Sequence, residues 1–161
     1  MPKEMTMNAR IKALAASALM AGTLVAPAAM AQPAAATAPL YERLGGLKGI
    51  TVVVDDFIHR LLVNEMLNRN PAISAGRKSS PAPYLQFQVS QMICEVTGGP
   101  CKYTGQGMKE SHAHLNITEE EWGVMAKELQ KSLDKFEVPA GEQKELFEIV
   151  GKTRLDIVTR K

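Results

Sequence analysis

Apolar side chains recur every three or four residues in several stretches of the chain, which is the spacing of one face of an α-helix. These stretches cover about residues 47–66, 84–97, 118–136 and 139–157. Their apolar positions, in chain order, are Val54, Phe57, Ile58, Leu61, Leu62, Leu85, Val89, Met92, Ile93, Val96, Trp122, Met125, Ala126, Leu129, Leu133, Phe136, Leu146, Ile149, Val150 and Ile157. No stretch alternates convincingly as a strand, so the pattern predicts an all-α domain with roughly five or six helices.

The third of these helices has the clearest start signal in the chain. Thr118 followed three residues later by Glu121 is a capping box, in which each side chain bonds the backbone N–H of the other residue. Ile117 and Trp122 are spaced as a hydrophobic staple across the same cap. These signals predict that a helix begins close to residue 118. Pro139 is compatible with the first turn of the last helix.

Other stretches are punctuated by glycine and proline. Residues 40–46 predict a short helical turn that is stopped by two glycines. Residues 68–83 contain an Asn-Pro pair, an Ala-Gly pair and two more prolines, which predicts a loop with at most one helical turn at residues 72–75. A short helix that carries two histidines is expected between the glycines near residue 105 and Asn116.

The N-terminal 31 residues have the composition of a secretory signal. Positive residues come first (Lys3, Arg10 and Lys12), an apolar run follows, and Ala29-Met30-Ala31 is a small-x-small cleavage site. The apolar run is short for a membrane span, which needs about 20 apolar residues. We expect cleavage after residue 31, a periplasmic location and no stable membrane insertion after cleavage. An uncleaved anchor is the alternative.

Cleavage would leave a flexible linker at residues 32–38 and one domain at residues 39–161. The leader holds three of the 19 Lys and Arg residues and one of the 17 Asp and Glu residues, which leaves 16 of each sign. A neutral domain has no electrostatic reason to bind nucleic acid, so we expect no nucleic-acid partner.

The two cysteines fit an oxidising compartment. Cys94 and Cys101 are seven residues apart across a Gly-Gly-Pro turn. If the glycines reverse the chain, the two Cα atoms can approach within the ~7 Å that a disulfide requires. Two unlinked thiols are the alternative. Neither cysteine belongs to a C-x-x-C-H motif, so covalent c-type haem attachment has no motif here.

His112 and His114 are the candidate metal ligands. A spacing of two residues turns them to opposite sides of a helix, so they cannot easily bind one metal ion together. His112 shares its side with Met108 and Leu115, whereas His114 lies on the polar side. An imidazole in an apolar setting stays neutral, and the neutral form binds metals. By spacing alone, a core histidine bonded to a backbone carbonyl is the better-supported alternative.

Several motifs together resemble one family, the truncated (two-over-two) haemoglobins of group I. They are Leu40-Tyr41-Glu42-Arg43-Leu44-Gly45-Gly46, Val52-Val53-Val54-Asp55-Asp56-Phe57, Thr97-Gly98-Gly99-Pro100, Tyr103-Thr104-Gly105, Met108-Lys109 with His112, and Ile117-Thr118. Their order and gaps match across nearly the whole chain after the leader.

The resemblance implies a globin-like two-over-two helical sandwich around a b-type haem, with His112 as the proximal iron ligand. Lys102, Tyr103 and Lys109 match positions near the haem propionates, although Lys109 is equally well explained as a solvated charge. The residues expected to contact the haem are Phe57, Ile58, Leu85, Gln88, Val89, Met92, Lys102, Tyr103, Met108, Lys109, Ile117, Trp122 and Met125.

The chain departs from the family on the distal side of the haem. Ile58 stands where the family usually has a tyrosine, and Leu85 and Val89 align with positions that are often polar. Gln88 borders this stripe and Gln86 is close by, so a shift of one residue would bring a glutamine over the iron. If the pocket is apolar, O₂ is expected to dissociate quickly.

Three functions remain open at this point. The first is reversible binding of O₂, CO or NO at the haem. The second is enzymatic, namely oxidation of NO to nitrate or a weak peroxidase activity. Because the chain has no flavin or nicotinamide motif, the enzyme would need an electron-donor protein as a partner. The third is a helical module without haem, in which His112 only packs in the core.

Overall fold

The structure of the chain is a computed structural model that describes residues 38–160. The predicted signal at residues 1–31 and all but the last residue of the predicted linker lie outside the described residues. The helices are α1 (Leu40–Arg43), α2 (Gly46–Val63), α3 (Glu65–Asn68), α4 (Pro71–Ser79), α5 (Ala82–Val96), α6 (Met108–His112), a 3₁₀ turn (Ala113–Leu115), α7 (Glu119–Lys135), α8 (Ala140–Lys152) and α9 (Arg154–Ile157), and the strands are β1 (Ile117–Thr118) and β2 (Val158–Arg160). No helix within residues 38–160 is long and apolar enough to cross a membrane.

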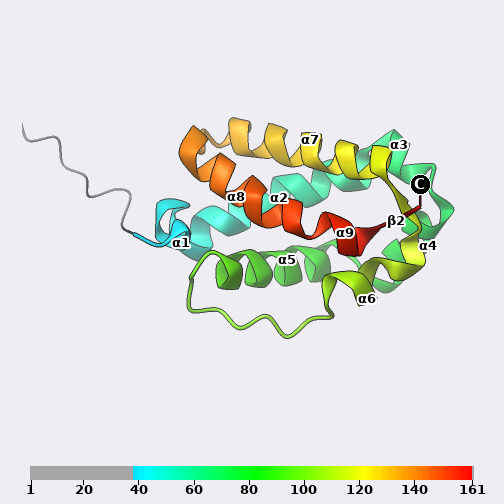
Figure 1. The fold of residues 1–161 in the computed structure, drawn as a ribbon, viewed down its shortest axis with the longest axis horizontal. Helices are drawn as coiled ribbons and strands as arrows, with labels where there is room; N and C mark the ends of the chain where they lie inside the picture. Colours follow the sequence, from blue (N-terminus) through cyan, green and yellow to red (C-terminus); the bar gives the residue numbers. More distant parts are fainter. Residues whose placement is uncertain (1–37, 161) are drawn as a thin grey trace, which may run out of the picture. The chain divides into compact units, whose positions relative to one another are not determined.

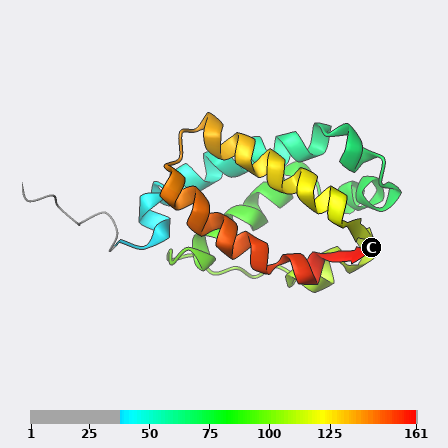
Figure 2. The same ribbon diagram turned by 45° about the horizontal axis from the view of Figure 1, so that its top comes forward.

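Two antiparallel helix pairs form the body of the domain (Figures 1 and 2). Helix α2 packs along α5, and the chain runs in opposite directions in the two. Helices α7 and α8 form the second pair, joined by a short connection that includes Glu137 in the left-handed region at φ 53°. Helix α2 also packs against α7 and so connects the pairs. This arrangement confirms the predicted all-α, two-over-two architecture.

Most of the core comes from the apolar faces that the sequence pattern identified, although Leu40, Ile50 and Cys94 were not among its positions. Ile50, Val54 and Ile58 of α2 are buried, and so are Leu129 and Leu133 of α7. They form one cluster with Leu40, Phe57, Ile93, Cys94 and Leu146. Burial of a Leu or Ile side chain contributes about 1.5–3 kcal/mol to folding, so this cluster is the main source of the fold's stability.

The capping box at the start of α7 is present as predicted. The Thr118 hydroxyl accepts a hydrogen bond from the Glu121 backbone N–H at 3.2 Å, and the Glu121 carboxylate accepts one from the Thr118 backbone N–H at 2.8 Å. Two backbone donors at this helix end are therefore satisfied, which fixes the point where the chain leaves the histidine-bearing segment.

The segment expected to be a loop at residues 68–83 is mostly helical, so this prediction was wrong. Asn70 caps α4: its side-chain oxygen accepts from the backbone N–H groups of Ala72 at 2.9 Å and Ile73 at 3.3 Å. Pro71 occupies the first helical position, where its missing N–H costs nothing. The Asn-Pro pair therefore starts a helix here instead of marking only a turn.

A short strand pair closes the C-terminal end of the domain, although no strand was expected. Strands β1 and β2 pair in parallel, with Ile117 opposite Val158 and Thr118 opposite Arg160. Two- and three-residue strands are too short to show apolar alternation, which is why the sequence pattern missed them. The pairing holds the C-terminal segment against the residues that follow α6 (Figure 2).

The predicted disulfide links Cys94 to Cys101, with their Cα atoms 5.7 Å apart. Gly98 adopts φ +88°, a left-handed conformation that side chains disfavour. At Gly99 a Cβ would lie 2.7 Å from both the carbonyl oxygen and the sulfur of Cys94. The two glycines thus let the chain reverse closely enough for the cysteines to meet, and the bond ties the following loop to the end of α5.

Candidate functional site

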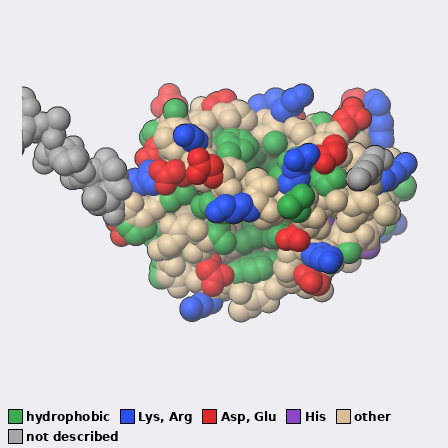
Figure 3. All heavy atoms as spheres, viewed as in Figure 1, with side chains coloured by type: hydrophobic (Ala, Val, Ile, Leu, Met, Phe, Trp, Pro, Cys, Tyr) green, Lys and Arg blue, Asp and Glu red, His purple; other side chains and the backbone are tan. Residues whose placement is uncertain are grey.

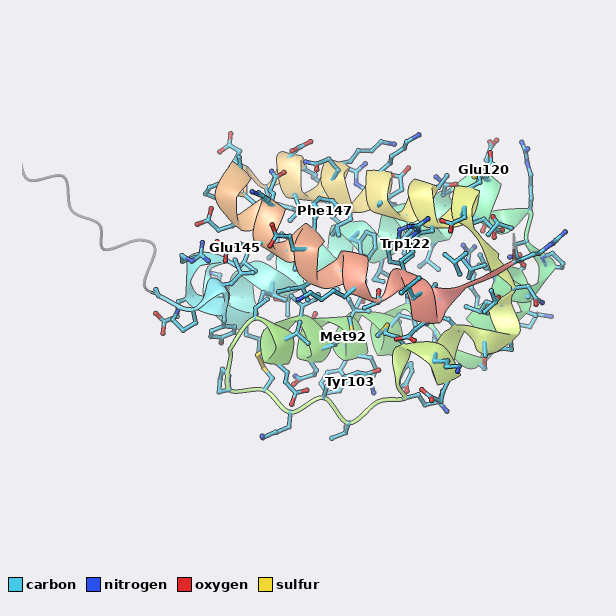
Figure 4. The ribbon with its side chains drawn as sticks, viewed as in Figure 1. Met92, Tyr103, Glu120, Trp122, Glu145 and Phe147 are labelled. Atoms are coloured by element: carbon cyan, nitrogen blue, oxygen red, sulfur yellow. A yellow bond between two sulfur atoms is a disulfide. The ribbon has the colours of Figure 1, made fainter. Side chains whose placement is uncertain are left out.

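A cavity of about 850 Å³ is enclosed by residues of α2, α4, α5, α6, α7 and α8. This volume is typical of sites for cofactors and other small molecules. Figure 3 shows hydrophobic side chains gathered between α8 and α5, with charged groups around them. Figure 4 labels Met92 on α5 and Trp122 on α7, one residue from each helix pair, and both line the cavity.

Most of the residues predicted to contact the cofactor line this one cavity. They are Phe57, Ile58, Leu85, Gln88, Val89, Met92, Tyr103, Met108, His112, Ile117, Trp122 and Met125. Lys102 and Lys109 do not line it, and both are exposed. The apolar stripe of each helix therefore faces a common space, and the two lysines point to solvent at its margin.

One wall of the cavity is apolar except for a single amide. Ile58, Leu85 and Val89 contribute aliphatic side chains, and Gln88 lies among them. The Gln88 side-chain oxygen is buried and has no hydrogen-bond partner within the described part of the chain. An amide end without a partner costs about 1–3 kcal/mol when buried, so a polar group in the cavity would stabilise it.

The second glutamine considered for this wall faces elsewhere. Gln86 donates a hydrogen bond from its amide to the Asp55 carboxylate at 2.5 Å, in an exposed position. It does not line the cavity. The structure thus selects Gln88 as the polar residue of this wall.

Another part of the cavity wall carries His112 at the end of α6. Its Nδ1 lies 2.9 Å from the Met108 carbonyl oxygen, four residues earlier in the same helix. A carbonyl oxygen only accepts, so Nδ1 carries the proton and donates it to Met108. The neutral ring then has a lone pair on Nε2, which is the atom left to bind a metal. The Ser111 hydroxyl lies 3.0 Å from the same Nδ1.

Burial, with a smaller contribution from His114, lowers the pKa of His112, and the hydrogen bond to Met108 only partly offsets this effect. The imidazole is therefore neutral at pH 7, which is the form that a metal requires. Among residues 38–160 no group of three or more His, Cys, Asp or Glu side chains is placed to hold a metal ion. His112 therefore suits a metal whose other ligands come from a cofactor.

The other two histidines are placed differently. His114 is exposed and reaches the cavity beside Gly76 of α4, which agrees with its predicted position on the polar side. His59 is exposed on α2 and does not line the cavity. His112 is thus the half-buried imidazole of the cavity wall.

Tyr103 lines the cavity from the loop that follows α5 (Figure 4). Its backbone N–H donates to the Glu95 carboxylate at 3.1 Å, and its hydroxyl donates to the Gln106 carbonyl at 2.8 Å. Burial, together with the nearby Tyr84, raises the pKa of the Tyr103 phenol. Tyr103 therefore stays a neutral hydrogen-bonding group at the edge of the cavity.

Sequence reasoning missed several residues of the cavity wall. Ile149 and Ile157 were identified as apolar inner positions, and their periodicity was the signal that could have assigned them to the site. Arg77 and Ile73 lie on α4 and line the cavity as well. They were missed because α4 was predicted to be a loop.

Comparison with known proteins gives consistent results. The model of the bacterial-like globin family matches residues 39–159. A group 1 truncated haemoglobin of Mycolicibacterium paratuberculosis is 29% identical over 122 residues, covering 76% of this chain and 85% of the relative. A group 1 truncated haemoglobin of Tetrahymena pyriformis is 23% identical over 119 residues, covering 74% of this chain and 93% of the relative.

Solved structures share the fold. The truncated haemoglobin of Tetrahymena pyriformis in its Fe(III) form superposes with a TM-score of 0.66 at 22% identity, covering 75% of this chain and 98% of that one. The 2/2 haemoglobin of Synechococcus sp. PCC 7002, solved in the cyanomet state with covalently attached haem, gives a TM-score of 0.67 at 24% identity and covers 76% and 100% of the two chains.

Proposed function

We propose a function for this chain from the premise that it belongs to the bacterial-like globin family. The protein binds haem b in the cavity, with His112 as the proximal iron ligand, and reversibly binds a diatomic gas such as O₂, CO or NO. The haem, when bound, supplies an iron with an open position for a small gas. The polypeptide supplies the proximal imidazole, an apolar enclosure and one polar group.

The observation that carries this proposal is that His112 lines a large, mainly apolar cavity while its Nδ1 bonds the Met108 carbonyl at 2.9 Å. The hydrogen bond fixes the tautomer in which Nε2 has the free lone pair, and it holds the ring in one orientation. The same bond would make Nε2 a more basic metal ligand.

The rest of the cavity fits the same cofactor. A porphyrin is a large apolar ring, and the wall around it consists mainly of Leu, Ile, Val, Met, Phe and Trp side chains. Gln88 is the amide of this wall, and its NH₂ end is a donor from which a bound diatomic gas could accept a hydrogen bond.

A visible spectrum of the purified protein tests the proposal. With hemin added, we expect a Soret band in the ferric and ferrous forms that shifts when CO is admitted. In His112→Ala this band should be lost or strongly altered, because no other buried imidazole lines the cavity. His114→Ala is the matched control and should keep the wild-type spectrum. A wild-type chain that stays colourless with hemin would overturn the proposed function.

We also propose that the protein acts outside the cytoplasm. The support is the disulfide between Cys94 and Cys101, a bond that persists in oxidising compartments, together with the predicted N-terminal signal. Fractionation of cells that express the full chain tests this. The periplasmic fraction should contain a form that begins at Gln32, and a full-length form confined to the cytoplasm would contradict export.

A further inference from the structure

The charged side chains of the cavity wall are few and differ in their bonding. Besides the histidines, Arg77 from α4 and Glu121 from α7 are the charged residues that line the cavity. The Glu121 carboxylate is already used on both oxygens: it accepts from Asn70 at 2.9 Å and from the Thr118 backbone N–H at 2.8 Å. Glu121 therefore does not neutralise Arg77, and no ion pair to Arg77 forms within the described residues.

Arg77 is held in place by the end of α2. Its Nη1 donates to the Leu62 carbonyl and its Nη2 donates to the Leu61 carbonyl, both at 2.9 Å. These bonds use two of the five N–H donors of the guanidinium. They orient the group and cap α2, but they leave its positive charge in a partly desolvated position, where burial lowers the pKa of Arg77. A cap alone would not require the side chain to line the cavity.

Helix α4 is anchored on the histidine side of the cavity. The Asn70 side chain donates to the Leu115 carbonyl at 3.0 Å, so the start of α4 is tied to the turn that follows His112. A Cβ at Gly76 would lie 3.3 Å from the Leu115 side chain, which shows how closely the two segments approach. Arg77 follows Gly76 directly and is thus carried to the cavity wall by a rigid element.

We propose that Arg77 is the residue that binds a carboxylate of the cofactor, namely a haem propionate, through its remaining N–H donors. This inference rests on the proposed haem binding and names the cation that the sequence did not. Lys102 and Lys109 are exposed and outside the wall, whereas Arg77 combines a fixed orientation with an unneutralised charge. A guanidinium also matches the planar carboxylate with two parallel hydrogen bonds.

A cycle of two changes isolates this contact. Wild-type protein and Arg77→Gln are each loaded with hemin or with hemin dimethyl ester, in which the propionates are uncharged. The rate of porphyrin transfer to excess apomyoglobin is then measured. With hemin, Arg77→Gln should lose the porphyrin roughly tenfold faster than wild type, as expected for a lost charge-assisted bond. With the ester, the two proteins should lose it at the same rate within about twofold.

Three results separate the explanations. If Arg77→Gln speeds the loss of hemin and ester equally, Arg77 only caps α2 and the inference is overturned. Equal rates for wild type and variant with hemin overturn it as well. If wild-type protein takes up neither porphyrin, the proposed function itself has failed.

Two controls keep the test decisive. Lys109→Gln removes an exposed charge and should leave the hemin rate unchanged, whereas a tenfold effect there would assign the propionate to Lys109. If Arg77→Gln does not fold, the variant Arg77→Lys, which keeps the positive charge, is used in its place. The cycle should then show a loss of hemin that is faster than wild type and an unchanged rate for the ester, and an equal effect on both would again overturn the inference.

Discussion

The Met108 carbonyl determines the tautomer of His112, because its hydrogen bond keeps the proton of the neutral ring on Nδ1. Without this acceptor, the neutral ring would exchange between two tautomers and two orientations. The helical spacing of four residues between donor and acceptor comes from the sequence itself. A single backbone atom thus leaves Nε2 as the ring nitrogen that is free to bind a metal.

Gln88 is the polar side chain of the cavity wall that also contains Ile58, Leu85 and Val89. We expect Gln88→Leu to raise the O₂ dissociation rate about fivefold, because a hydrogen bond from the amide to the gas contributes about 1 kcal/mol net. Stopped-flow displacement of O₂ by CO measures this rate. Gln86→Leu is the control and should have no effect, since Gln86 bonds Asp55 outside the cavity.

The opposite outcome is also informative. An O₂ dissociation rate that is fast in wild type and unchanged in Gln88→Leu would mean that the amide does not reach the gas. The distal wall would then be functionally apolar, as Ile58, Leu85 and Val89 alone suggest. If O₂ dissociated slowly from wild type and from Gln88→Leu alike, the result would contradict both the polar and the apolar interpretation of this wall.

At the scale of the elements, one covalent bond links the loop after α5 to that helix. The disulfide closes a short loop that carries Tyr103 to the cavity. Cys94 is fully buried at the end of α5, so the loop is fixed at its inner end. The loop also bonds the end of α5 through the backbone N–H groups of Gly98 and Gly99, which donate to the Glu95 and Cys94 carbonyls, and through the Tyr103 N–H, which donates to the Glu95 carboxylate.

We therefore expect the free energy of unfolding of the double variant Cys94→Ala/Cys101→Ala to be about 2–3 kcal/mol lower than that of wild type, because the unfolded chain regains its loop-closure entropy. Urea titrations of the two proteins measure the difference. Dithiothreitol should lower the stability of wild type towards that of the variant and should leave the variant unchanged. Equal stability of oxidised wild type and variant would show that the bond adds nothing.

At the scale of the whole molecule, a charge network joins the two helix pairs. The Asp56 carboxylate of α2 accepts from the Lys135 ammonium at 2.5 Å and from the Ser132 hydroxyl at 2.8 Å, both on α7. Arg60 of the same helix donates to it at 2.6 Å. Burial raises the pKa of Asp56, but these donors outweigh that effect and hold the pKa well below its usual range.

A carboxylate with a depressed pKa stabilises the fold above its unfolded pKa of about 4, and this contribution is lost as the pH falls through the folded pKa. Asp56→Asn should accordingly cost about 2 kcal/mol at pH 7 and less at pH 3. Urea unfolding of wild type and variant at both pH values measures this. A difference that is equal at the two pH values would show that the charge of Asp56 is not involved.

How much the sequence could predict depends on the range of the interaction. The long amphipathic helices, the capping box at Thr118 and the pairing of Cys94 with Cys101 are local signals, and the structure confirms them. The prediction of a loop at residues 68–83 was wrong, because helix α4 lies there. Its residues have weak helix propensity, and bonds from Asn70 to Leu115 and Glu121 tie it to distant parts of the chain.

The sequence by itself determined the apolar faces of the long helices, the start of α7 and the side of α6 on which His112 lies, because periodicity and caps act over a few residues. Only the tertiary structure decided between Gln88 and Gln86, since the two lie on opposite sides of α5 and the packing of that helix determines which side faces the cavity. It also brought Arg77 to the cavity, because that position depends on α4 docking against the turn after His112. Contacts between distant segments have no periodic signal in the chain, and the packing of the folded domain selects them.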